Sequence, residues 1–207
     1  MAHTLTSLIE AVGSMLKDSS NTYWSADEIE DAIRWALAEY SAVNPRRLET
    51  TIDDAAGSRE YSLGSITGLL KVTRVWWPYD ATDTVYPPNS VQWYMLDDDT
   101  LFLDAQREPD GTGKIRVFYT AGHIIEGLDG ALATSVDDMG CQLLIIGAAG
   151  RCVLMKSREA IDSINVSTEV ARDWEHWGLA RAREFGDGIE RVMNRERMVG
   201  DARVGWG

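Results

Sequence analysis

The sequence is poor in residues that form disulfides or bind metals, with two cysteines and three histidines among 207 residues. Cys141 and Cys152 have no CxxC context, and one continuous helix would place them roughly 16 Å apart. A disulfide between them is therefore excluded, and we expect both to be small core residues. No pair among His3, His123 and His176 has the spacing of metal ligands. The sequence predicts neither a metal nor a cofactor.

Motifs of catalysis are also missing. There is no G-x-S-x-G elbow and no cysteine–histidine nucleophile context. Gly147-Ala-Ala-Gly150 follows no predicted strand and lacks the Lys-Ser or Lys-Thr that completes a phosphate-binding loop. His123 is typical of a packing residue, and Asp97-Asp98-Asp99 favours a charged hairpin tip over a calcium loop. We predict that the protein is not an enzyme.

Long apolar runs are absent as well. The most apolar stretch, from Cys141 to Met155, contains Gln142 and Arg151 and is shorter than the roughly 17 residues that a membrane span requires. The N-terminal residues lack the basic start and apolar core of a signal peptide. We therefore expect a buried helix at this stretch, no membrane contact, and a protein made in a cytoplasm.

Basic residues are scarce outside the C-terminal region. The formal net charge is -13, and residues 172–207 contribute nothing to it, because seven arginines there balance seven acidic residues. That region contains no lysine. An acidic body repels the phosphates of DNA, whereas arginine forms bidentate pairs with carboxylates of a partner.

Helical periodicity is present at both ends of the chain. Residues 4–18 repeat apolar side chains at helical spacing, and Ser25-Ala-Asp-Glu28 is a capping box that starts a second helix, which Asn44-Pro45 ends. Residues 139–160 are apolar nearly all round, which is typical of a helix packed on several sides. A last helix is expected from Thr168 to Arg197, with a kink or weak point at Gly186-Asp-Gly188.

Between these helices the apolar period changes to two. From Arg46 to Thr120, short segments rich in β-branched and aromatic residues alternate with turn sequences, which predicts an antiparallel module of five or six strands, a small sandwich or barrel. The predicted fold class is therefore α+β, with a four-helix core of two N-terminal and two C-terminal helices. The predicted parts are a helical domain (1–45 and 121–197), an inserted β domain (46–120) and an extended C-terminal docking tail (198–207).

Some tryptophans and glycines favour contact with another chain. Trp76 and Trp77 are adjacent on a predicted strand and point to opposite faces, so they cannot share one core. Glycines inside a helix cost about 1 kcal/mol each, which close packing of another backbone would explain. The alternative for the aromatic residues is core packing. The candidate subunit-interface residues are Trp76, Trp77, Gly147, Gly150, Trp174 and Trp177.

Trp206 lies one residue from the end of the sequence, where an indole is unexpected. It follows an arginine-rich helix, and its flanking Gly205 and Gly207 let the backbone lie close to a partner. Tryptophan and arginine are common interface hot spots; the alternative is a chance terminus. The candidate docking residues are Arg191, Arg195, Arg197, Met198, Val199, Arg203, Val204 and Trp206.

Three local motifs follow one another in an order known from one family. They are Tyr23-Trp24-Ser25 with the helix up to Pro45, then Tyr119-Thr120 with His123 and the segment 127–131 (GLDGA), and finally Asp173-Trp174-Glu175. Together with the helix–β–helix order, they resemble the head–tail connector (adaptor) proteins of tailed bacteriophages. The sequence departs from that family in its tryptophan content, its glycines at 178, 186 and 188, and its polar hairpins.

The resemblance implies a structural role in the virion neck, at the head–tail interface. Connectors of this kind form a homo-oligomeric ring, commonly of twelve subunits, under the portal protein. They extend the DNA channel, help retain packaged DNA and provide a platform for tail attachment. The implied partners are the portal, a downstream tail or stopper protein, and DNA that passes without sequence-specific binding. Such a protein is made in the host cytoplasm, and its C-terminal segment docks onto the portal.

Two other interpretations are open. The chain could be another neck or tail-completion protein of the virion, such as a stopper or a tail-base adaptor. The β module could instead be a carbohydrate-binding domain that uses Trp76 or Trp93 as a stacking platform.

Overall fold

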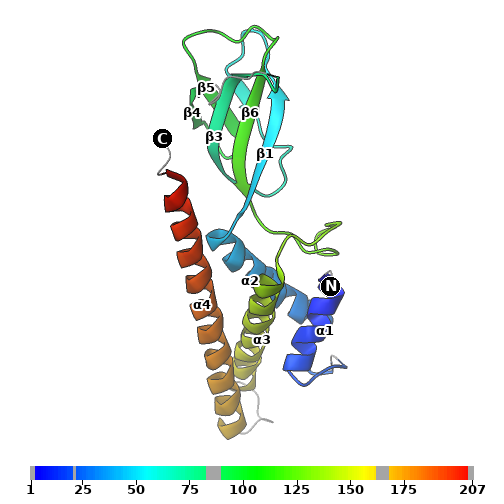
Figure 1. Ribbon diagram of the computed structural model, residues 1–207. Coiled ribbons are helices and arrows are strands. Elements are labelled where there is room, and N and C mark those ends of the chain that lie inside the picture. Colours follow the sequence, from blue (N-terminus) through cyan, green and yellow to red (C-terminus); the bar gives the residue numbers. More distant parts are fainter. Residues whose placement is uncertain (1–2, 21, 83–89, 162–167, 205–207) are drawn as a thin grey trace. The chain divides into compact units, whose positions relative to one another are not determined.

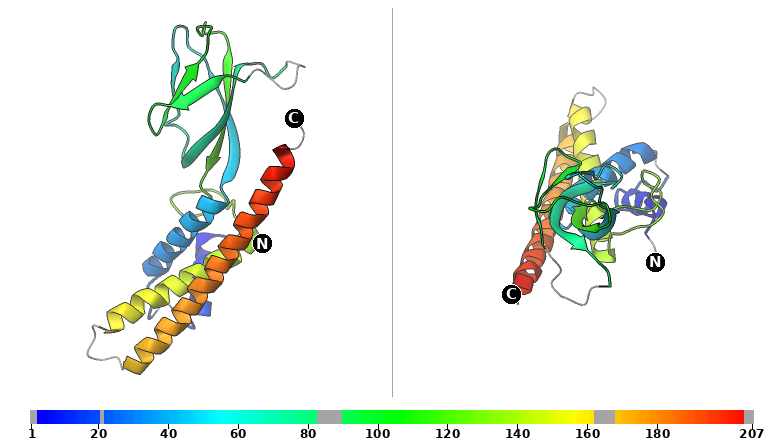
Figure 2. Two further views of the ribbon diagram at one scale, coloured as in Figure 1. Left: turned by 90° about the vertical axis from the view of Figure 1, so that its left-hand side faces the viewer. Right: turned by 90° about the horizontal axis from the view of Figure 1, so that it is seen from above.

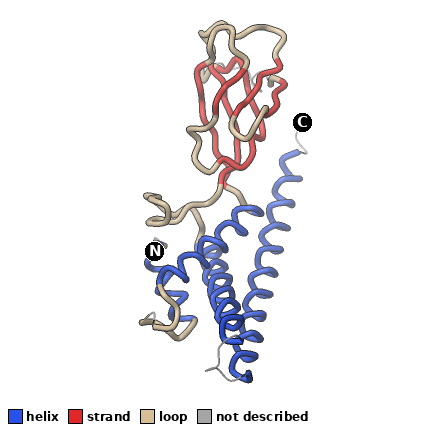
Figure 3. Tube along the Cα trace, turned by 180° about the vertical axis from the view of Figure 1, so that it is seen from behind, coloured by secondary structure: helices blue, strands red, loops and turns tan. Residues whose placement is uncertain are grey.

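The computed structural model describes residues 3–20, 22–82, 90–161 and 168–204. The chain divides into two units, one made of Met1–Pro45 with His123–Gly207 and the other of Arg46–Gly122. We call them the helical unit and the β unit, because the helices lie in the first and the strands in the second (Figure 3). The fold class is α+β, as the sequence predicts.

Within the described ranges the helical unit has four helices, α1 (Leu5–Met15), α2 (Ala26–Val43), α3 (Asp138–Ile161) and α4 (Thr168–Val204) (Figure 1). The predicted capping box starts α2, since the Ser25 side chain accepts from the Glu28 amide and the Glu28 side chain accepts from the Ser25 amide. Thr4 and Ser7 form a second capping box on α1. Pro45 follows the end of α2, where its ring cannot continue the helix.

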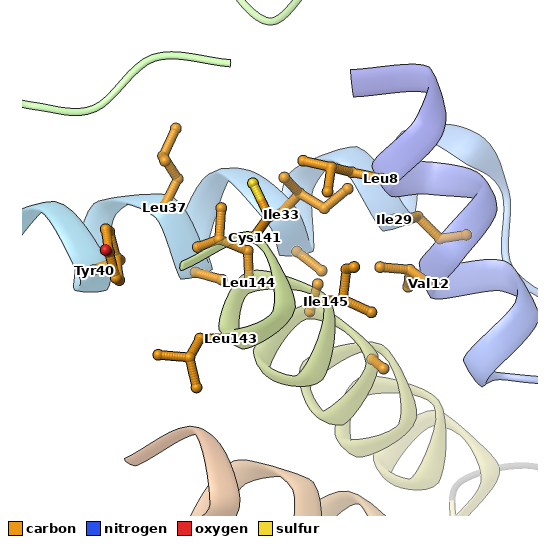
Figure 4. Packing of buried hydrophobic residues seen from close by; sticks show 14 of the residues in the cluster. Leu8, Val12, Ile29, Ile33, Leu37, Tyr40, Cys141, Leu143, Leu144 and Ile145 are labelled. Atoms are coloured by element: carbon orange, nitrogen blue, oxygen red, sulfur yellow. The ribbon is translucent and has the colours of Figure 1, made fainter. Parts of the chain in front are cut away.

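All four helices contribute to the core of the helical unit. Leu8 of α1, Ile33 of α2 and Leu144 of α3 are buried together, and Phe185 of α4 joins the same cluster. Figure 4 shows α3 between α1 and α2 on one side and α4 on the other. The all-round apolar sequence of α3 is therefore explained by packing within this chain.

The segment Asp138–Glu159 of α3 is long and apolar enough to cross a membrane, by length and composition alone. The apolar run from Cys141 to Met155, considered in the sequence analysis, is shorter than a membrane span requires. In the structure 61% of the longer window is buried inside the chain. A core helix that is packed on several sides passes the same test of length and hydropathy, and α3 has the packing of such a core helix.

The C-terminal part of α4 corrects two expectations. The helix was expected to end at Arg197 and an extended tail to begin at residue 198, but α4 continues to Val204. It also runs through Gly186 and Gly188 without a break. Arginine, methionine and glutamate in the segment after Val192 are good helix formers, so the helix continues there without an apolar period.

Glycines allow α3 and α4 to approach closely as an antiparallel pair (Figure 2). A Cβ added to Gly150 would lie 2.9 Å from the Arg181 Cβ and 3.1 Å from the Ala182 amide nitrogen, and one on Gly147 would lie 2.8 Å from the Phe185 ring. Close packing of another backbone was expected at these glycines. At Gly150 that backbone is α4 of the same chain, whereas at Gly147 the close neighbour is the Phe185 side chain of α4. Gly147 and Gly150 are buried within the chain and do not form an exposed subunit interface.

The described part of the β unit is a sandwich of two three-stranded antiparallel sheets and not a closed barrel. One sheet has the order β1-β6-β3, from β1 (Arg46–Asp53), β6 (Lys114–Ala121) and β3 (Leu69–Tyr79). The other has the order β2-β5-β4, from β2 (Glu60–Ser62), β5 (Thr100–Asp104) and β4 (Gln92–Met95). These six strands lie in the segments that the period of two predicts.

Trp76 and Trp77 point to opposite faces of β3, as the sequence predicts. Trp77 is buried between the sheets, where its indole N–H donates to the Asp54 carboxylate (3.0 Å), which also accepts from the Gly113 amide (2.9 Å). Trp77 is therefore a core residue and not a subunit-interface residue. Trp76 is half-buried on the outer face, with its ring 4.5 Å from that of Phe118.

Candidate functional site

A groove in the helical unit contains two of the candidate docking residues. It encloses about 450 Å³ between the start of α3 and the middle of α4. Arg191 and Arg195 are one helical turn apart on α4, so both side chains lie along the same face. Its lining residues are Met139, Leu143, Gly188, Arg191, Val192 and Arg195. We call it the α3–α4 groove.

The apolar floor of the groove depends on a close helix contact. A Cβ added to Gly188 would overlap the Leu143 side chain, so only glycine leaves Leu143 its place. Leu143 points away from α2 and toward α4 (Figure 4). Met139, in the first turn of α3, is 60% exposed. The floor thus combines a covered leucine with an accessible methionine, whose flexible side chain adapts to a partner.

Arginine charge surrounds this floor. Arg191 and Arg195 are both exposed, and the Arg191 Nε donates to the backbone carbonyl of Asp187 (3.2 Å). The charge of Arg195 also reaches Tyr40: burial raises the pKa of the Tyr40 hydroxyl, and Arg195 is among the groups that oppose this rise. An apolar floor beside two guanidinium groups fits a partner segment that carries an apolar side chain and carboxylates.

The remaining docking candidates lie farther along the chain. In the structure α4 extends past the groove, so these positions continue a helix and do not form an extended strand. Position 199 follows positions 191 and 195 at the same four-residue spacing. Arg197, Met198, Val199, Arg203 and Val204 belong to α4, whereas Trp206 lies outside the described residues.

Trp174 packs within the helical unit. Its ring lies 5.7 Å from Tyr23, edge-on, and 6.5 Å from Trp24. Trp177 is 37% exposed, with the Arg181 guanidinium 5.7 Å from its ring. Trp177 is thus exposed on the surface of α4, while Trp174 is half-buried in an aromatic cluster of its own chain.

The tryptophans proposed as a sugar platform lie in two different environments. Trp93 is partly buried and packs against the core of the β unit, so its ring is not an open stacking surface. Trp76 already packs edge-on against Phe118, and Arg74 lies 5.9 Å from its ring. Neither environment favours carbohydrate binding.

In the ranges that the structure describes, no group of three or more His, Cys, Asp or Glu side chains could hold a metal ion. His123 is a packing residue, as predicted, since its Nε2 lies 2.7 Å from the Asn44 carbonyl and its Nδ1 lies 3.0 Å from the Ser135 hydroxyl. Asp97 accepts from the amides of Asp99 (3.1 Å) and Thr100 (2.7 Å), which confirms the predicted hairpin tip.

The two cysteines are free thiols buried in α3. Burial raises the pKa of Cys141 to about 11 and that of Cys152 to about 12. Because the thiolate is the reactive form, we expect neither thiol to react with iodoacetamide at neutral pH while the protein is folded, and both to react after unfolding. Mass spectrometry counts the adducts; rapid labelling of the native chain would contradict this expectation.

The sequence identifies the arginines of the groove but not its floor. Met139 and Leu143 lie in a stretch that is apolar nearly all round. Such a stretch has no polar face, so its periodicity does not show which apolar positions stay exposed.

No family model matches this sequence, and no curated protein matches it. Among solved structures, a chain from the neck of a native gene transfer agent (GTA) particle, computed with C12 symmetry, matches with a TM-score of 0.31 and 14% sequence identity. The match covers 84% of this chain and 91% of that chain. A TM-score of this size does not demonstrate a shared fold.

Proposed function

We propose that this protein is a structural head–tail connector of a tailed bacteriophage or phage-like particle. The observation that carries the proposal is the order of the two units: a β sandwich is inserted between α2 and α3 of a helical unit, in a chain whose motifs follow the order of the connector family. In this role the protein sits in the virion neck as a ring under the portal. It is made in the host cytoplasm and is not an enzyme.

The α3–α4 groove is the proposed portal-docking site. Its floor, Met139 and Leu143, would bury an apolar side chain of the portal, while Arg191 and Arg195 would pair with carboxylates beside it. Helix α4 continues beyond the groove to Val204. A fully desolvated apolar contact ringed by charge is the usual composition of an interface hot spot.

The acidic charge of the chain suits a channel for DNA. With a net charge of -13, the protein body repels phosphates, so DNA would pass without sequence-specific binding. The ring would extend the portal channel, help retain the packaged genome and provide a platform for the tail or stopper protein that follows.

Deletion of the gene tests this role. We expect electron microscopy to show DNA-filled or DNA-leaking heads without tails, and a copy supplied in trans should restore tailed particles. Particles with normal tails in the deletion strain would contradict the connector role.

Another neck or tail-completion protein is the competing assignment within the virion. Crosslinking followed by mass spectrometry separates the two, because a connector under the portal requires direct links to the portal protein. Links to tail proteins alone would favour the stopper or tail-base role.

A further inference from the structure

The two sheets of the β unit carry opposite charge. The strands of the β1-β6-β3 sheet contain six basic and two acidic residues. The strands of the β2-β5-β4 sheet contain two acidic residues and no lysine or arginine. In a chain with 33 acidic and 20 basic residues, a sheet with a basic excess is a local departure that the overall composition does not explain.

The outer face of the β1-β6-β3 sheet, which we call the basic face, combines this charge with aromatic rings. Register places Arg74 beside Phe118 and Trp76 beside Arg116. The exposed Arg74 guanidinium lies 5.9 Å from the Trp76 ring and 5.8 Å from the Phe118 ring. Arg116 forms an ion pair with Glu49, so Arg74 is the exposed positive charge at the aromatic centre of this face.

The outer face of the β2-β5-β4 sheet, which we call the acidic face, also combines aromatic rings with charge, but the charge is negative. Phe102 pairs with Glu60 on one side and with Tyr94 on the other. Tyr94 is 47% exposed and stacks on Phe102 at 4.8 Å. Asp104, next to Gln92 in register, is exposed, and the acidic β4–β5 turn extends this charge.

One basic side chain lies near the acidic face. Arg59, which precedes β2, donates to the backbone carbonyl of Ala105 and keeps its positive charge there. It offsets one acidic charge, and the acidic residues of the strands and of the β4–β5 turn outnumber it. Because the two sheets share one core, their outer faces lie on opposite sides of the sandwich. The β unit therefore presents a basic aromatic surface on one side and an acidic aromatic surface on the other.

We infer that the basic face of one copy of this chain binds the acidic face of a second copy. Like faces would repel, which disfavours a two-fold dimer through either face, whereas unlike faces attract and place aromatic rings against each other. A contact between two different faces leaves one face of each kind open at the ends. Such head-to-tail contacts close into a ring when their rotation permits.

This inference deepens the proposed function by naming the surface through which neighbouring subunits meet. It does not involve the α3–α4 groove, which is assigned to the portal. The self-association of the purified chain can therefore be tested without the portal.

Sedimentation equilibrium of the full-length chain at low and high salt tests the interface. We expect self-association that weakens with salt, and we expect Arg74→Glu and Asp104→Lys each to weaken it by at least about tenfold. An equimolar mixture of the two variants should associate again, because each contributes the face that the other has lost. Arg183→Glu and Glu175→Lys, at exposed positions on α4, make the same charge changes and should have no effect.

Several outcomes would overturn the inference. They are a wild-type chain that stays monomeric at low salt, a mixture that stays monomeric, or equal effects of the control variants. Binding of single-stranded DNA that Arg74→Glu abolishes, without self-association, would assign the basic face to another occupant. A monomeric chain combined with tailless particles in the deletion strain would refute this interface and leave the neck role standing.

Discussion

Gly150→Leu is expected to destabilise the helical unit by about 3 kcal/mol, because overpacking a close contact forces the neighbouring backbone to move. An added Cβ already lies 2.9 Å from the Arg181 Cβ, 3.1 Å from the Ala182 amide nitrogen and 3.3 Å from the Gly178 carbonyl oxygen. Backbone atoms cannot rotate out of the way as a flexible side chain does. Helices α3 and α4 would have to separate, which would also open the contact between Gly147 and Phe185.

Gly186→Ala is the matched control on the facing helix. No atom lies within 4 Å of a Cβ added there, so the substitution gains helix propensity and should stabilise the protein by about 1 kcal/mol. Urea unfolding followed by far-UV circular dichroism of the full-length chain measures both effects. Equal stability of Gly150→Leu and the wild type would show that α3 and α4 do not pack as described.

The proposed docking of the α3–α4 groove onto the portal predicts a large effect of charge reversal. Arg191→Glu with Arg195→Glu is expected to weaken binding to the purified portal at least about 100-fold, because loss of a charged partner in a desolvated contact costs several kcal/mol. Both side chains are exposed in the free chain, so the helical unit should fold normally. Surface plasmon resonance with immobilised portal gives the dissociation constants.

The control for this pair is Arg172→Glu with Arg183→Glu. Both positions are exposed on α4 and outside the groove, so this variant makes the same charge change on the same helix. Its portal affinity should be close to that of the wild type. Equal loss in both double variants would mean a general electrostatic effect and would remove the groove from the docking site.

Local patterns predicted most of the secondary structure. The capping box at Ser25 and the proline after Asn44 set the ends of α2, and the period of two located all six described strands. These signals succeed because capping hydrogen bonds and the alternation of a half-buried strand depend on nearby residues. The opposite orientation of Trp76 and Trp77 follows from the same alternation.

Tertiary partners were harder to predict. The sequence predicts close packing at Gly147 and Gly150 but does not show whether the partner lies in the same chain. The partner is the α4 backbone at Gly150 and the Phe185 side chain of α4 at Gly147. The end of α4 was placed too early because its last turns have no apolar period, although their residues favour a helix. The opposite charge of the two sheets could not be read from the sequence, since it depends on which strands pair.

A cryo-electron microscopy reconstruction of the neck of the particles in which this chain is proposed to act tests the connector role most directly. We expect a closed ring of copies of this chain between the portal and the tail, with Arg191 and Arg195 against the portal. A neck in which the portal contacts the tail proteins directly, with this chain absent from the purified particle, would contradict the role.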